Sequence, residues 1–488
     1  MAQTSGGGTG RVAHYVGGTF LPGGPRTFPL VDPVDGTVRG HAPEADEAVV
    51  DAAVQAARAA LDGAWGTTTV ADRAAALRRI ADGIEARFAA FANAEIADTG
   101  RPRDLAETLD IPRAIGNFRA YADLLYGRPE RAYTTAVPAW SGGSGQALNY
   151  TVRKPLGVVA VISPWNLPLL LLTWKVAPAL AAGNAVIAKP SEESPSTAML
   201  LAEVIDAAGL PPGAFNLVHG HGANSAGEFL TRHDGVDAVA FTGESATGSA
   251  IMRNAADHLT AVSFELGGKN PAVVFADADL EAAVAGTARS AFTHSGQICL
   301  CTERVYVERP VYDLFVEELG KRARALTGYG PMISAAHRDK VLSYYRLAVT
   351  EGATVVAGGG QPRFGDARDG GFHVEPTVLT GLPNSARTLQ EEVFGPVCHV
   401  APFDTEEQAL ALANDTRYGL AATVWTRDLA RAHRFAPKLD AGIVWVNAWN
   451  VRDLRTPFGG VKASGIGREG GEYSLDFFSE PANICISY

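Results

Sequence analysis

A cysteine and a glutamate in this chain have the surroundings of a nucleophile and a base. Cys299 ends the segment FTHSGQIC, and Glu265 lies upstream in FELGGK. A thiolate can add to a carbonyl carbon and hold a covalent intermediate, and a carboxylate of suitable pKa can then activate the water that releases it. The pair therefore predicts oxidation of an aldehyde through a thioester.

Each residue taken alone also has an ordinary structural interpretation. Most lone cysteines are small buried apolar residues, and an asparagine such as Asn166, in PWNLP, is common in turns. His294, five residues before Cys299, would suit a Cys–His hydrolase, but we interpret it as structural. Cys301 is expected to serve packing.

Further motifs follow one another in a fixed order. They are PWNLP at 164–168, KPSE at 189–192, FTG at 241–243, EEVFGP at 391–396 and PFGG at 457–460. Together with the cysteine and glutamate segments, they resemble the NAD(P)-dependent aldehyde dehydrogenase superfamily from about residue 15 to the C-terminus. The resemblance implies an α/β fold of two doubly wound domains with a small β arm for oligomerisation.

The resemblance also implies roles for individual residues. Cys299 would be the nucleophile, the Asn166 amide and the Cys299 backbone N–H would stabilise the oxyanion, and Glu265 would activate the deacylating water. An acylating enzyme that uses coenzyme A would not need this base. The residues expected to bind the cofactor are Ile162, Ser163, Pro164, Trp165, Lys189, Glu192, Phe241, Thr242, Gly243, Ser245, Leu266, Glu392 and Phe394.

The expected cofactor is NAD. Lys189 and Glu192 match the family pair that binds the adenosine ribose, and a carboxylate there would accept hydrogen bonds from both hydroxyls and repel a 2′-phosphate. Glu392 and Phe394 match residues at the nicotinamide ribose and ring.

The phosphate-binding segment departs from the common family pattern. Gly243 and Gly248 have phosphate-loop spacing, but Ser-Ala follows where a nucleoside triphosphatase needs Lys-Ser or Lys-Thr. Glu244 replaces the usual serine. We expect Glu244 to point away, or the anion contacts to fall to Ser245 and the backbone at a helix N-terminus.

Two arginines lie where many relatives have apolar residues in the substrate tunnel. Guanidinium groups at Arg113 and Arg452 would bind a substrate carboxylate through paired hydrogen bonds. Alternatively, the arginines are solvated or form ion pairs, Arg452 with Asp453 or Asp110. The residues expected to contact substrate are Arg113, Arg452, Leu167, Trp174 and Phe458.

The segments around these arginines are most similar to a branch that acts on 2-aminomuconic and 2-hydroxymuconic 6-semialdehydes, after ring cleavage in tryptophan or catechol breakdown. Other aldehydes, such as betaine aldehyde or succinic semialdehyde, remain alternatives. A noncatalytic protein that retains the fold is another.

Composition excludes several other classes. A net charge of −11 argues against a nucleic-acid groove, and the apolar stretch 167–180 contains Lys175 and is too short to cross about 30 Å of hydrocarbon. The four cysteines have no paired C-x-x-C spacing and no histidine cluster accompanies them, so we expect no metal site and a reducing compartment. The leader MAQTSGGG lacks signal-peptide character, and we expect a cytoplasmic protein.

The pattern of apolar residues predicts the elements that must position the site. Three- and four-residue spacings predict helices at 46–62, 71–98 and 103–127. Short apolar runs predict strands at 158–162, 185–188, 215–218 and 238–241, and in a second series at 272–275, 304–307, 354–357, 398–401, 422–425 and 443–446. We expect an NAD-binding domain at 1–132 and 151–262, a catalytic domain at 263–473, and an arm of 133–150 and 474–488 that builds a homodimer or homotetramer.

Overall fold

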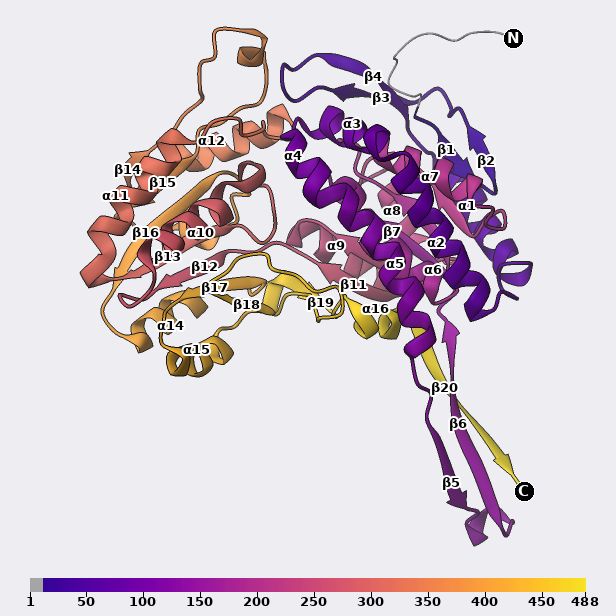
Figure 1. Ribbon diagram of the computed structural model, residues 1–488. Coiled ribbons are helices and arrows are strands. Elements are labelled where there is room, and N and C mark those ends of the chain that lie inside the picture. Colours follow the sequence, from indigo (N-terminus) through magenta and orange to yellow (C-terminus); the bar gives the residue numbers. More distant parts are fainter. Residues whose placement is uncertain (1–11) are drawn as a thin grey trace.

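Two large sheets with helices on their faces organise the chain (Figure 1). The computed structural model describes residues 12–488, so the leader expected at residues 1–8 lies outside the described residues. The first sheet has the order β19 (Gly465–Ile466), β11 (Ala261–Glu265), β10 (Ala238–Thr242), β7 (Val158–Ile162), β8 (Ala185–Lys189), β9 (Phe215–Leu217), β1 (His14–Val16) and β2 (Thr19–Leu21). The second has the order β14 (Thr354–Ala357), β15 (Thr377–Thr380), β16 (Val397–Phe403), β13 (Thr302–Glu308), β12 (Asn270–Val274), β17 (Ala421–Trp425) and β18 (Ile443–Val446).

The strand order of the first sheet creates a binding edge. From β7 the chain moves outward in one direction to β8 and β9, and then returns to place β10 and β11 on the other side of β7. These five strands are mutually parallel. In such sheets ligands bind beyond the carboxyl ends of the strands where the order reverses. The motifs at 163–166, 189–192 and 242–245 follow three of these ends.

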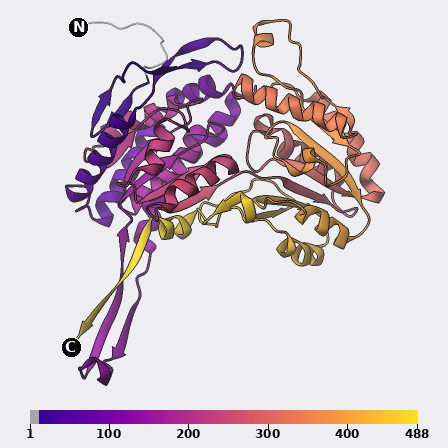
Figure 2. The ribbon, with the colours of Figure 1, turned by 180° about the vertical axis from the view of Figure 1, so that it is seen from behind.

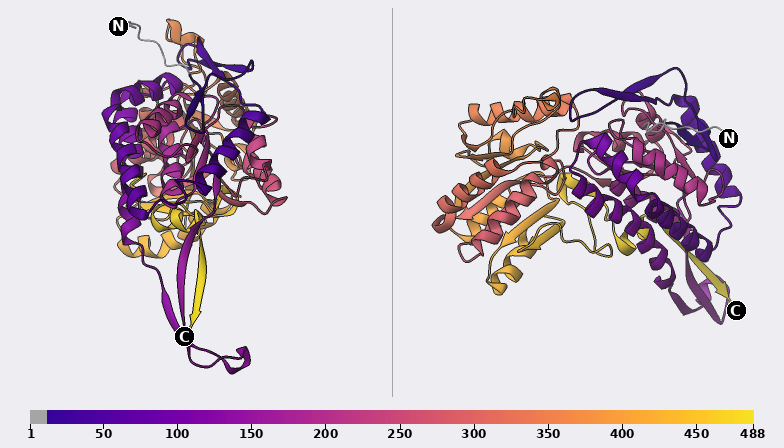
Figure 3. Two further views of the ribbon diagram at one scale, coloured as in Figure 1. Left: turned by 90° about the vertical axis from the view of Figure 1, so that its right-hand side faces the viewer. Right: turned by 45° about the horizontal axis from the view of Figure 1, so that its top comes forward.

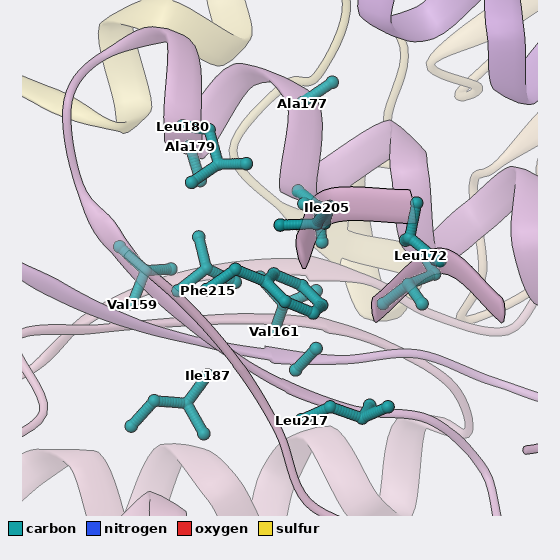
Figure 4. Packing of buried hydrophobic residues seen from close by; sticks show 14 of the residues in the cluster. Val159, Val161, Leu172, Ala177, Ala179, Leu180, Ile187, Ile205, Phe215 and Leu217 are labelled. Carbon is teal, nitrogen blue, oxygen red and sulfur yellow. The ribbon is translucent and has the colours of Figure 1, made fainter. Parts of the chain in front are cut away.

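The core of the first sheet explains why the predicted strands form. Val159 and Val161 have no exposed surface and lie in one buried cluster with Leu172 and Phe215, and Ile187 is equally buried on the other face of the sheet (Figure 4). Strands of a parallel sheet are covered on both faces, which requires continuous apolar runs. Each fully buried side chain of this size contributes about 1.5–3 kcal/mol. All ten predicted strands are present, and the α/β class is confirmed.

The helices cover both sheets (Figures 1 and 2). Around the first sheet they are α1 (Glu47–Asp62), α2 (Val70–Ala86), α3 (Phe88–Thr99), α4 (Arg103–Leu105), α5 (Ile111–Gly127), α6 (Pro168–Ala181), α7 (Ser196–Ala207), α8 (Ala226–Arg232), α9 (Ser245–Ala256) and α16 (Gly471–Phe477). Around the second they are α10 (Leu280–Phe292), α11 (Arg309–Ala325), α12 (Ala335–Thr350), α13 (Arg387–Gln390), α14 (Glu406–Asn414) and α15 (Leu429–Phe435).

Two helix predictions were wrong in detail. The helix expected at 71–98 is two helices, because Arg87 (φ −111°, ψ 22°) ends α2 and begins α3. The helix expected at 103–127 contains a π-helical turn, Ala106–Asp110, between α4 and α5. Pro112 has no N–H, and in a regular α-helix its ring would clash with the carbonyl group four residues before it. The helical turn that precedes Pro112 therefore contains one extra residue.

The apolar stretch from 167 to 180 forms most of α6, which is almost entirely buried. In the described part of the chain, no helix is both long and apolar enough to cross a membrane.

A three-stranded arm projects from the body. It consists of β5 (Ala132–Ala136), β6 (Gln146–Pro155) and β20 (Ser479–Ser487), with β6 in the middle. Figure 3 shows that this arm extends well beyond the helices and sheets. Short strands that the sequence did not predict include β11, β15 and the N-terminal hairpin β3 (Thr27–Val31) and β4 (Val38–Pro43). These four strands are four to six residues long and too short for a clear period.

Candidate active site

The candidate site lies where the chain crosses from the first sheet to the second. Glu265 is the last residue of β11, and Asn270 begins β12. The Glu265 carboxyl is buried, and its Oε1 has no hydrogen-bond partner among residues 12–488. Gly459 packs against it: φ is +148°, and a Cβ there would lie 2.8 Å from Glu265 Oε1. The glycines of PFGG therefore leave room for the expected base.

A left-handed turn presents the expected nucleophile. His294, Ser295 and Gly296 all have positive φ (51°, 53° and 72°). Gln297 then fixes the loop: its Nε2 donates to Pro331 O at 3.0 Å, and its Oε1 accepts from Ile333 N at 3.0 Å.

Asn270 holds the next part of the same loop. Its Nδ2 donates to the carbonyl oxygens of Cys299 (2.7 Å) and Cys301 (2.8 Å). The segments GQIC and FELGGKN thus bind one another, which explains why both motifs occur together.

The Asn166 amide reaches the same loop from the first sheet. Asn166 follows β7, is buried, and donates from Nδ2 to Gln297 O at 2.8 Å. Asn166 and Cys299 line one cavity. The structure therefore brings the expected nucleophile and oxyanion donor together.

Burial dominates the electrostatics of the site. It raises the pKa of Cys299 to about 12, with smaller contributions from the negative charges of Glu265 and Glu392. It also raises the pKa of Glu265 well above its ordinary value, assisted by Glu469 and opposed by Lys175 and Arg452. At neutral pH the free thiol is protonated, and Glu265 is a weaker acid than an exposed glutamic acid.

The cavity at Cys299 extends between the two sheets. Its volume is about 380 Å³. The expected cofactor residues that line it are Pro164, Trp165, Thr242, Gly243, Leu266, Glu392 and Phe394. Glu244 also borders this cavity, although one expectation from the sequence was that it would point away.

Glycines admit Glu392 to this cavity. The Gly268 N–H donates to Glu392 Oε1 at 2.8 Å. A Cβ on Gly267 would lie 2.2 Å from Glu392 Oε2, so a larger residue there would displace the Glu392 carboxyl group. Phe394 has φ +60°, a strained conformation that is typical of functional sites.

A second cavity of about 720 Å³ lies along β8, β10 and α9, lined in part by Ile162, Lys189 and Phe241. Glu192 lies beside it, with one carboxylate oxygen 3.6 Å from Lys189 Nζ and the other 3.6 Å from His221 Nδ1. Burial favours the neutral acid, but Lys189 and His221 hold the pKa of Glu192 below its ordinary value.

Two serines expected at the cofactor are placed differently. The Ser163 hydroxyl is buried without a hydrogen-bond partner in the described residues, whereas the Ser245 hydroxyl donates to Ala463 O at 3.0 Å. Only the backbone of Ser245 is therefore free to meet an anion at the start of α9.

The two expected substrate arginines lie against the same indole ring. The Cζ atoms of Arg113 and Arg452 both lie 5.3 Å from the Trp174 ring, and Arg452 also stacks 3.9 Å from Phe458. Neither arginine forms an ion pair within residues 12–488. Burial, followed by the charge of Arg452, lowers the pKa of Arg113 to about 10.

The alternative pairing of Arg452 does not occur. Asp453 binds Arg455 at 2.6 Å, and Asp110 binds Arg101. Nε and Nη2 of Arg452 are buried without hydrogen-bond partners in the described chain. Two guanidinium groups without ion-pair partners among the described residues thus lie against an apolar cluster that includes Leu167, Trp174 and Phe458.

Some residues at the site had no signal in the sequence. His337 contacts Trp165 and Phe394 through ring edges, and its Nε2 lies 2.8 Å from Phe394 O. Lys175 forms a buried ion pair with Glu469 near Glu265. His294 is buried, as its structural interpretation requires, and Cys301 lies in an apolar cluster.

Comparisons with known proteins agree with this geometry. The aldehyde dehydrogenase family profile matches residues 20–484. A 2-aminomuconic 6-semialdehyde dehydrogenase from Pseudomonas sp. is 58% identical over 482 residues, with 97% of each chain covered. A 2-hydroxymuconic semialdehyde dehydrogenase from Pseudomonas sp. (strain CF600) is 56% identical over 485 residues, which cover 97% of this chain and 99% of the relative.

Solved structures with a similar fold are also aldehyde dehydrogenases. An aldehyde dehydrogenase from Bacillus cereus, solved as an NAD+ complex, superposes with a TM-score of 0.93 at 37% identity and covers 98% of this chain and 97% of that one. These matches confirm the resemblance carried by the motifs. The chain belongs to the aldehyde dehydrogenase family.

Proposed function

We propose that this enzyme oxidises an aldehyde that also carries a carboxylate, 2-aminomuconic or 2-hydroxymuconic 6-semialdehyde, to the dicarboxylic acid with NAD. The observation that carries the proposal is that two guanidinium groups, which form no ion pair within residues 12–488, both lie against Trp174. Two relatives named for these substrates, more than half identical to this chain, support it. A quaternary ammonium aldehyde such as betaine aldehyde would be repelled by both charges.

The residues present fit the dinucleotide. The two cavities follow the carboxyl ends of β7, β8 and β10, where such cofactors bind. Lys189 and Glu192 would hold the adenosine ribose, and Glu392, held by Gly268, would bind the nicotinamide ribose. When bound, the dinucleotide would supply a nicotinamide ring as the hydride acceptor, so that the Cys299 adduct can be oxidised to a thioester.

The protein supplies the remaining chemistry. Cys299 gives its proton to solvent, and the electron pair of Sγ bonds to the aldehyde carbon. The carbonyl oxygen becomes an oxyanion that accepts hydrogen bonds from Asn166 Nδ2 and the Cys299 N–H. Later Glu265 takes a proton from water, whose oxygen bonds to the acyl carbon. The C–S bond then breaks, which frees the acid and the cysteine.

Replacing Arg452 by alanine should weaken use of the carboxylated aldehyde selectively. A hydrogen bond to a charged group contributes about 1.5–3 kcal/mol, so its loss should lower kcat/KM by roughly 10- to 150-fold. Arg113→Ala should have a smaller effect. The measurement compares kcat/KM for the semialdehyde with that for a neutral aldehyde of similar size, which should change little.

Arg455→Ala is the matched control, because Arg455 lies on the same loop but is exposed and paired with Asp453. It should leave both substrates nearly unaffected. Equal losses for the charged and neutral aldehydes in Arg452→Ala would mean that the arginine is structural, and the acidic-substrate proposal would lose its support.

NAD should be preferred over NADP by at least about tenfold in kcat/KM, which corresponds to ~1.4 kcal/mol. The physical reason is the Glu192 carboxylate, which Lys189 and His221 keep ionised and which would repel a 2′-phosphate. Initial rates with each cofactor measure the preference, and Glu192→Gln should narrow it. Equal kcat/KM for both cofactors in the unmodified enzyme would remove Glu192 from this role.

In this proposal, the two sheets and the arm have different roles. The first sheet binds the dinucleotide, the second carries the nucleophile loop, and the arm joins copies of the chain into a dimer or tetramer. Exposed apolar residues on the arm support its role in oligomerisation: Trp140 is 88% exposed, and Tyr133, Ile486 and Tyr488 are also exposed.

A further inference from the structure

Arg101 lies behind the expected oxyanion hole. It follows Gly100, which ends α3 in a left-handed conformation (φ +64°), and only 2% of its surface is exposed. Its guanidinium donates to the backbone carbonyl oxygen of Asn166 and to Asp110 Oδ2. Its Nη2 also lies 3.0 Å from His294 Nε2. One buried side chain thus joins α3, the π-helical turn, PWNLP and the turn before the nucleophile.

We propose that Arg101 is a positioning residue that fixes the Asn166 peptide and thereby aims the Asn166 amide at the oxyanion. Asn166 is then held at both ends, by Arg101 at its backbone oxygen and by Gln297 O at its side-chain Nδ2. The inference rests on the proposed role of Asn166 in the reaction.

The charges around Arg101 suit this task. Asp110, which lies in the π-helical turn, and Glu95 of α3, 3.7 Å from Arg101 Nη1, are both fully buried and balance the guanidinium. Burial, followed by the charge of Arg101, keeps the pKa of His294 well below its ordinary value. A neutral ring can accept a hydrogen bond at Nε2 and does not repel the arginine. Charge-assisted hydrogen bonds in such a buried site are strong and directional.

The first test replaces Arg101 by methionine and follows the pre-steady-state burst of NADH. Misplacing a reacting group by about 1 Å lowers rates up to ~10²-fold, so the burst rate should fall by roughly 10- to 100-fold, with the Kd of NAD unchanged. Arg101→Lys should recover most of the rate, because an ammonium can still donate to the Asn166 carbonyl. If Arg101→Met does not fold, Asp110→Asn, which weakens the anchor of Arg101, should lower the burst in the same direction.

The second test is a double-mutant cycle with Asn166→Ala. If Arg101 acts through Asn166, adding Arg101→Met to Asn166→Ala should lower the burst by less than about threefold further. An effect as large as in the unmodified enzyme would overturn the proposal. Asn166→Ala with a normal burst would instead refute the proposed role of Asn166, which distinguishes the two failures.

Arg39→Met provides the matched control for loss of a buried charge. Arg39 binds the buried Asp98 of α3 at 2.7 Å and makes no hydrogen bond to the site. Its replacement should destabilise the protein to unfolding by urea but leave the burst rate within about threefold. Equal loss of burst rate in Arg39→Met and Arg101→Met would show that Arg101 serves stability alone.

Discussion

Cys299→Ala is expected to abolish NADH formation, because no other group can form the covalent intermediate. Activity should fall by at least about 10⁴-fold, the scale seen when a covalent nucleophile is removed. NAD should still bind with nearly unchanged Kd, since the cavity walls that would hold it come mainly from other residues. Steady-state assays and titration of NAD against protein fluorescence measure the two quantities.

Cys301→Ala controls for the loss of a thiol nearby. Cys301 is buried among Ile298, Leu300 and Trp445, and its Sγ lies 3.9 Å from Thr293 O. Its replacement removes a small apolar contact and should retain most activity. Turnover near that of the unmodified enzyme in Cys299→Ala would end the thioester mechanism.

Glu265→Gln should still reduce one NAD per site but release the acid slowly. An amide cannot accept the proton of water, and general bases typically contribute ~10²–10⁴-fold. Steady-state turnover should fall by that factor, the NADH burst should remain, and an acyl adduct should appear by mass spectrometry. The trapped adduct distinguishes loss of deacylation from general damage.

The same residue should set a pH dependence. Only the ionised carboxylate can accept a proton, and burial, assisted by Glu469, raises the pKa of Glu265 above its ordinary value. Deacylation should therefore rise as pH rises through this pKa, and the rise should be absent in Glu265→Gln. Glu391→Gln, which alters a half-buried carboxylate paired with Arg387 and Tyr344, should keep both turnover and the pH profile. Unchanged turnover in Glu265→Gln would mean that another group activates the water.

How much of this could be predicted from the sequence depends on the range of each interaction. Buried parallel strands need continuous apolar runs, so β7, β8 and β10 could be predicted from local sequence. The family motifs predicted the residues now gathered between the sheets. The contacts of Arg113 and Arg452 with Trp174 bring together three segments that are distant in the sequence. The sequence indicated only that two positions carry arginine where many relatives have an apolar residue.

Other features had no local signal. Arg101 looks like an ordinary surface arginine in the sequence, and its burial depends on carboxylates and a carbonyl from other segments. His337 lies in the first turn of α12, in a segment without a recognisable motif. It contacts Phe394 only through the tertiary fold, because the two residues are far apart in the sequence. The apolar spacing continues from α2 into α3, so the sequence predicted one helix and gave no sign of the break at Arg87.

The π-helical turn at 106–110 links two contacts in this enzyme, that of Asp110 with Arg101 and that of Arg113 with Trp174. Deleting one codon there would restore a regular α-helix and rotate the two flanking segments by about 100° relative to each other. Either Asp110 would then leave Arg101, or α5 would slip by one residue and carry Arg113 away from Trp174. If the proposed roles of Arg101 and Arg113 hold, a variant that lacks this extra residue should lose either its oxyanion support or its preference for acidic aldehydes. We therefore expect the length of this short segment to vary less among relatives than the identity of its exposed side chains.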